Sequence, residues 1–207
     1  MKKFAIIIFS LLSLGLYAQE VPSPEFDPHT WEAPYDLSLP KDWGVERFAI
    51  PISFAPQIDY KGVEDIRFTP GWAKASSEEY WTYAFLWYLD GDVKLDAKKL
   101  EQNLKSYYTG LISANGNAIP KEKLITVVAS FKEIQKGKED IKTFSGTIKM
   151  LDYMKQVPIT LFCKVHLRSC SQENKTFMFY ELSPQPFSHN VWLGLNKLWN
   201  DLKCKKN

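Results

Sequence analysis

Four strand-like runs joined by short turns occupy residues 125–182, and they restrict the fold more than any other feature of the chain. Apolar and polar residues alternate in 125–131 and again in 159–167, which is the period of a half-buried strand. The turn Lys136-Gly137-Lys138 has hairpin length, and no connection between these runs is long enough for a crossover helix. The runs are therefore predicted to form an antiparallel meander.

Two other segments have helical spacing. One apolar stripe runs through residues 97–112, with Asp96 at the N-cap position, and a second runs through 188–203. The second stripe contains Trp192 and Trp199, which should be buried against the sheet. Together these patterns predict an α+β fold: an antiparallel sheet of about six or seven strands and two main helices, with the C-terminal helix packed on the sheet.

Residues 79–89 are ambiguous between helix and strand. Ser76 and Glu79 have the spacing of a helix capping box, and Gly91 suits a helix C-cap. Six of the eleven residues are aromatic, however, which is typical of a strand. We interpret the segment as a strand, and its two apolar faces predict a central position covered on both sides.

Two shorter strands are expected earlier in the chain, over 48–54 and 63–68. The alternation in 48–54 is regular, but Pro51 has no N–H to donate to a neighbouring strand. We therefore expect 48–54 to lie at an edge of the sheet.

The first 18 residues have the layout of a secretory signal peptide. Lys2 and Lys3 precede an apolar run from Phe4 to Leu16, and Ala18 follows at a plausible cleavage point. We expect an exported protein, periplasmic or secreted, with no transmembrane segment in its mature chain. Residues 19–42 contain five prolines and several aromatic residues, so we expect an extended arm pinned across a single α+β domain of residues 43–207.

Charge and cysteine content narrow the possible partners. The chain has 26 basic and 24 acidic residues, and removal of Lys2 and Lys3 leaves 24 of each, which argues against nucleic-acid binding. An exported protein can form disulfides, and we predict a Cys170–Cys204 pair with Cys163 as a buried free thiol. The spacing around these cysteines fits no usual zinc site, so no metal is expected. No cofactor is expected either.

Few residues suggest catalysis, and no nucleophile elbow, phosphate loop or metalloprotease motif is present. Glu64, Asp65 and Arg67 could orient a polar ligand, but a structural ion pair is the favoured interpretation. His166 is expected on a solvent-exposed face of its strand, which it shares with Thr160, Lys164 and Arg168. A hydrolase using Glu64 or Asp65 with His166 is kept as the alternative function.

The aromatic segment suggests a binding function. Trp72, Trp81, Tyr83 and Trp87 could contact a ligand, although aromatic residues of a central strand can also be plain core. Residues 80–89 contain no basic group, so the ligand is expected to be uncharged, either sugar-like or apolar. We expect a non-catalytic domain that binds such a ligand, or a protein partner, in a pocket between a curved sheet and the C-terminal helix.

One further pattern spans the early strands. It consists of Phe54-x-Pro56, then Tyr60-x-Gly62-x-Glu64-Asp65-Ile66-Arg67-Phe68-x-Pro70-Gly71-Trp72, then Tyr80-Trp81-Thr82-Tyr83. In these residues the chain resembles exported bacterial proteins of unassigned function. The resemblance implies no activity, cofactor or catalytic residue.

Overall fold

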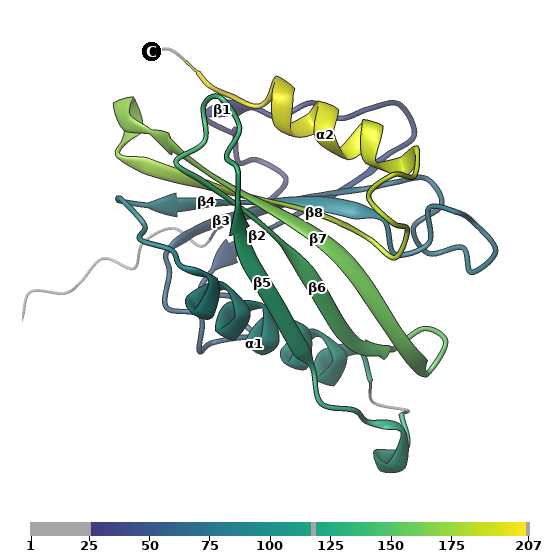
Figure 1. The fold of residues 1–207 in the computed structure, drawn as a ribbon. Coiled ribbons are helices and arrows are strands. Elements are labelled where there is room, and N and C mark those ends of the chain that lie inside the picture. Colours follow the sequence, from purple (N-terminus) through teal and green to yellow (C-terminus); the bar gives the residue numbers. More distant parts are fainter. Residues whose placement is uncertain (1–25, 117–118, 206–207) are drawn as a thin grey trace, which may run out of the picture.

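The fold is a curved antiparallel sheet with one helix on each face (Figure 1). A computed structural model describes residues 26–116 and 119–205, and the predicted signal peptide lies outside these ranges. The seven strands follow the order β2-β3-β4-β8-β7-β6-β5. Their bounds are β2 Gly44–Ile50, β3 Gly62–Phe68, β4 Tyr83–Asp90, β5 Val128–Ile134, β6 Lys142–Asp152, β7 Val157–Cys170 and β8 Lys175–Ser183. The helices are α1 Ala97–Asn115 and α2 Val191–Asp201, and two 3₁₀ turns cover Lys121–Lys123 and Ser171–Glu173.

The predicted meander is confirmed. Strands β5 to β8 pair in chain order, all antiparallel, so each hairpin connection places consecutive strands side by side. β8 then pairs with β4, which joins the meander to the β2–β3–β4 half of the sheet. The α+β prediction, including the packing of the C-terminal helix on the sheet, is therefore correct.

The aromatic segment is a strand, although a shorter one than predicted. β4 begins at Tyr83, because residues 70–81 form a series of turns closed by the Trp81 N–H, which donates to the Trp72 carbonyl at 2.8 Å. β4 lies between β3 and β8, and every residue from Tyr83 to Leu89 is buried. Its burial on both faces matches the sequence prediction.

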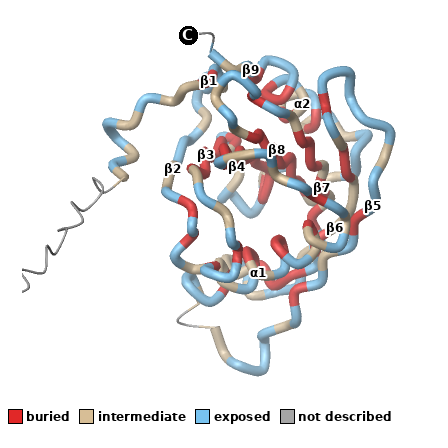
Figure 2. Tube along the Cα trace, turned by 90° about the vertical axis from the view of Figure 1, so that its left-hand side faces the viewer, coloured by how far each residue is buried: buried red, intermediate tan, exposed pale blue. Residues whose placement is uncertain are grey.

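The expected strand 48–54 is wrong in its bounds. β2 is an edge strand, as Pro51 indicates, but it covers Gly44–Ile50 and ends immediately before that proline. Ile52 is buried and Phe54 half-buried in the loop that follows, so their alternation reflects turns that return to the core. Buried residues gather on the strands and on the inner sides of the helices (Figure 2).

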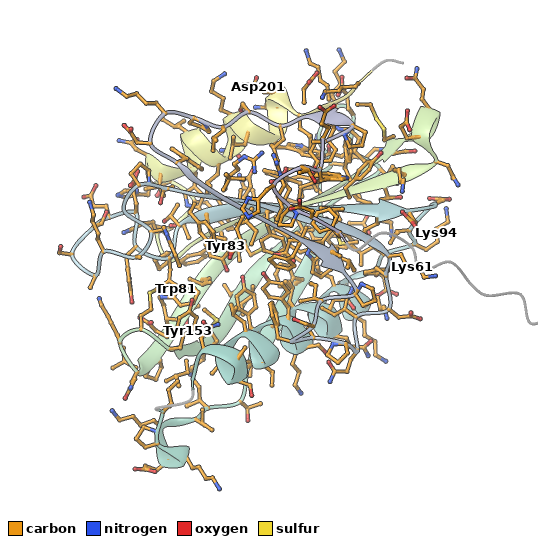
Figure 3. All side chains as sticks on the ribbon, turned by 180° about the vertical axis from the view of Figure 1, so that it is seen from behind. Lys61, Trp81, Tyr83, Lys94, Tyr153 and Asp201 are labelled. Carbon is orange, nitrogen blue, oxygen red and sulfur yellow. A yellow bond between two sulfur atoms is a disulfide. The ribbon has the colours of Figure 1, made fainter. Side chains whose placement is uncertain are left out.

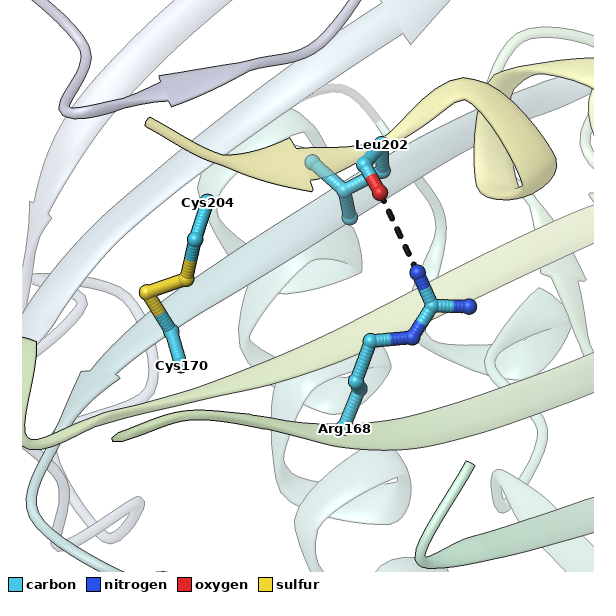
Figure 4. The surroundings of a disulfide bond; sticks show 4 residues. All are labelled: Arg168, Cys170, Leu202 and Cys204. Carbon is cyan, nitrogen blue, oxygen red and sulfur yellow. Dashed lines mark hydrogen bonds between the residues drawn. A yellow bond between two sulfur atoms is a disulfide. The ribbon is translucent and has the colours of Figure 1, made fainter. Parts of the chain in front are cut away.

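The face covered by α2 also holds the arm and the disulfide. Trp192 and Trp199 are 1% and 4% exposed, as predicted. In the arm, the two-residue strand β1 Tyr35–Asp36 pairs with β9 Lys203–Cys204. Cys170 is bonded to Cys204 beside the Arg168 side chain, which donates to the Leu202 carbonyl (Figure 4). Cys163 is free and buried on the other face, as predicted.

Candidate aromatic cavity

A cavity lies on the α1 face, where β2, β3 and β4 meet the C-terminal half of α1. It has a volume of about 870 Å³, within the usual range for small-molecule sites. Eight aromatic side chains line it: Phe48, Phe54, Phe68, Trp72, Trp81, Tyr83, Tyr107 and Tyr153. The sequence predicts a pocket between the sheet and the C-terminal helix. That face is instead filled by Trp192, Trp199 and their apolar neighbours.

The eight aromatic lining residues form the wall of the cavity, and the strand register brings several of them together. Gly44 pairs with Phe68, and Phe68 with Tyr83, so the three positions share one face across three strands. The Phe68 ring stacks on Trp72 at 4.4 Å between centroids and lies 5.8 Å from Tyr83. Because Gly44 has no side chain, the space above this end of β2 stays open.

Trp81 has the most unusual backbone of the wall. Its φ is +56°, a left-handed conformation that is rare for a bulky side chain. The ring lies 5.2 Å from Tyr153 and 6.3 Å from Tyr83, and the three side chains gather at one end of the sheet (Figure 3). The Trp81 Nε1–H is buried beside the Tyr80 hydroxyl group, yet it makes no well-formed hydrogen bond to any described residue. Strained residues of this kind concentrate at ligand sites.

The loop of residues 51–60 forms the rim of the cavity. Ile52, Ala55 and Ile58 anchor it in the core, while Ser53 is exposed at the mouth. The loop backbone touches α1 at Gly110, where an added Cβ would lie 1.8 Å from the Phe54 carbonyl oxygen. Gly110 therefore permits the close approach that places Phe54 against Tyr107, 5.2 Å between ring centroids.

The polar groups behind the wall are buried and neutral. Glu64 accepts hydrogen bonds from Trp87 Nε1 at 2.8 Å and from the Tyr107 hydroxyl at 2.6 Å. Burial nevertheless raises the pKa of Glu64 to about 8, because it outweighs these two bonds. Burial likewise raises the pKa of Tyr83 well above its ordinary value, and its hydroxyl pairs with that of Tyr108. Uncharged groups therefore back the aromatic wall at neutral pH.

Three of the four predicted aromatic contacts, Trp72, Trp81 and Tyr83, line the cavity. Trp87 is fully buried behind it, as the donor to Glu64. Arg67 points to the opposite face, where it pairs with Asp65. Asp65 also binds Arg47 and the Tyr35 hydroxyl, so this set forms the structural ion pair that the sequence analysis favoured.

The prediction that His166 is solvent-exposed is wrong. Its ring stacks on Trp199 of α2, with centroids 4.8 Å apart, and the residue is 9% exposed. Nδ1 lies 2.8 Å from Asp140, and Nε2 lies 3.7 Å from the buried Glu181 carboxylate. The polar pattern of the strand concealed this burial because the covering residue comes from α2, more than 30 positions later in the chain.

Sequence reasoning missed several wall residues. Phe48 and Phe68 were assigned to strands without a role, Tyr107 to the helix core, and Tyr153 to no element. Glu46, the single charged side chain of the lining, was also missed. A strand register that paired β2 with β3 would have identified Glu46 and Phe48, whereas nothing local to Tyr153 indicates its position.

Comparison with protein-family models, with curated proteins and with solved structures finds no match to this chain. Within the described ranges, no helix is long and apolar enough to cross a membrane. The same ranges contain no group of three or more His, Cys, Asp or Glu residues arranged to hold a metal ion.

Proposed function

We propose that this protein is a non-catalytic binding domain that holds a small, mainly apolar ligand in the aromatic cavity. The observation that carries the proposal is a cavity of about 870 Å³ lined by eight aromatic rings and a single charged side chain. Such a lining binds apolar or ring-shaped molecules through their faces, and the hydroxyls of Tyr83 and Tyr107 are already occupied by Tyr108 and Glu64.

The wall is more than an ordinary core. Phe48, Phe54, Phe68 and Trp72 all retain partial exposure around the cavity, whereas β4 beside them is buried from Tyr83 to Leu89. An anionic ligand is disfavoured, because no Lys or Arg is among the lining residues. The Cys170–Cys204 disulfide supports the further proposal that the protein acts after export, since such bonds persist in oxidising compartments.

The hydrolase alternative has less support. Glu64 lies on the α1 face and His166 on the α2 face, so the sheet separates them. Asp65 shares a face with His166, but β4 and β8 lie between their strands, a separation of about 14 Å at ordinary strand spacing. Asp65 is also occupied by Arg67, Arg47 and Tyr35.

A neutral fluorescent probe tests the proposal. N-phenyl-naphthylamine, which brightens in apolar sites, should bind the purified protein saturably with one site per chain. Ser53→Trp places a large side chain at the mouth and should weaken binding about tenfold or more through steric exclusion. Gln57→Trp changes an exposed position of the same loop that does not line the cavity, and it should bind as the unmodified protein does.

Two outcomes would refute the cavity as the binding site. One is the absence of saturable binding. The other is equal weakening by the Ser53 and Gln57 substitutions, which would indicate a general effect of the added tryptophan.

A further inference from the structure

Glu46 gives the cavity a charge that the aromatic segment alone does not have. It lies on β2, paired with Ile66 of β3, and so shares the face that lines the cavity. It is exposed and forms no hydrogen bond or ion pair with any other described residue. Arg47, its neighbour in sequence, points to the opposite face and is paired with Asp65.

The negative charge of Glu46 affects the pKa of ionisable groups in and behind the cavity wall. Burial is the main cause of the raised pKa of Glu64, Tyr107 and Tyr153, and the negative charge of Glu46 adds to it in all three groups. Tyr107 lies on α1 and Tyr153 in the turn after β6. The charge of Glu46 on β2 therefore influences groups on two other elements that line the cavity.

The aromatic rings add to the same preference. The face of an aromatic ring carries partial negative charge and attracts cations, with Trp the strongest and quaternary ammonium groups the best-known ligands. Trp72 and Trp81 both line this cavity, together with three tyrosines and three phenylalanines. Lys155, two residues after Tyr153, lies over the Tyr80 ring and donates to the Ala75 carbonyl, and it is not among the lining residues.

Building on the proposed function, we infer that the occupant of the cavity is an organic cation, with an apolar body against the rings and an ammonium group facing Glu46. This revises the expectation of an uncharged ligand, which rested on residues 80–89 alone. The lining has one unpaired carboxylate, partly exposed rings and no basic side chain, so an ammonium group meets attraction there and no like charge.

A matched set of three probes separates charge from shape. Benzyltrimethylammonium is the cation, neopentylbenzene is its neutral isostere with carbon in place of nitrogen, and 3-phenylpropanoate is an anion of similar size. In titrations followed by calorimetry or tryptophan fluorescence, the cation should bind about tenfold more tightly than its isostere. The anion should bind most weakly.

Glu46→Gln supplies the decisive comparison. It should weaken binding of the cation several-fold and leave binding of neopentylbenzene unchanged, because it removes only the charge. Glu122→Gln neutralises an exposed carboxylate away from the cavity and should change neither affinity. Raised salt should weaken the cation more in the unmodified protein than in the Glu46 variant.

Equal affinity for the cation and its isostere, or an unchanged cation affinity in Glu46→Gln, would overturn the inference. If neopentylbenzene or the naphthylamine probe still binds at the cavity, the proposed binding function stands while its cationic specificity falls. If no probe of any charge binds there, both are wrong.

Discussion

Two glutamates lie fully buried on opposite faces of the sheet, and they differ in their surroundings. Glu64 accepts two hydrogen bonds from Trp87 and Tyr107. Glu181 has no hydrogen-bond partner among the described residues, and His166 Nε2 lies 3.7 Å from its carboxylate. Burial is the main cause that raises the pKa of each to about 8. Each group therefore favours the protonated state when the chain is folded.

The stability of the fold should therefore depend on pH with an unusual sign. Between about pH 4.5 and 8 the folded protein holds protons on these groups that the unfolded chain releases, so stability falls as pH rises. For each group, the free energy of unfolding decreases by up to about 1.4 kcal/mol per pH unit in this range. Denaturant unfolding at a series of pH values should show this decline, and Glu64→Gln and Glu181→Gln should each flatten it.

Glu122→Gln, at an exposed position, is the control and should keep the slope of the unmodified protein. Stability that rises from pH 5 to pH 8, or a slope unaffected by both buried substitutions, would contradict the account of these two carboxyl groups.

The contact of α1 with loop 51–60 depends on a single glycine. In most helix interiors Gly→Ala is favourable by about 0.5–1 kcal/mol. At Gly110 the added methyl group would lie 1.8 Å from the Phe54 carbonyl oxygen, and the clash reverses that sign. We expect Gly110→Ala to destabilise the fold by roughly 1–3 kcal/mol and to weaken probe binding by displacing the loop.

Thr109→Ala is the matched control, because Thr109 is the exposed preceding residue of the same helix. It should leave stability and probe affinity nearly unchanged in denaturant unfolding and fluorescence titration. A Gly110→Ala protein that is more stable and binds the probe normally would show that the loop does not rest on α1 as described.

Local patterns were enough to predict most elements but not their contacts. Alternation and hairpin turns predicted β5 to β8, and the heptad-spaced tryptophans predicted the buried side of α2. The disulfide was also predictable, since Cys170 ends a strand and Cys204 follows the last helix. Element ends were less predictable: the turns before Tyr83 remain aromatic and the loop after Ile50 keeps an apolar alternation, although the strands have stopped.

At the scale of the whole molecule, the cavity forms where three loops from distant parts of the chain converge at one end of the sheet. These are the loop 51–60, the turns of 69–82 and the turn that holds Tyr153. The sequence identified the aromatic residues of one of them. The other rings, and the choice of the α1 face over the α2 face, depend on strand register and helix placement, which a local pattern does not contain.

The most direct test of the binding site uses the indole N–H signals of the seven tryptophans, which report on both faces of the sheet at once. In nitrogen–proton correlation spectra, assigned by single Trp→Phe substitutions, saturation with the naphthylamine probe should shift the signals of Trp72 and Trp81. The signals of Trp192 and Trp199, which are packed under α2, should stay in place. Shifts confined to Trp192 and Trp199, or no shift of Trp81 at saturation, would contradict the assignment of the aromatic cavity as the ligand site.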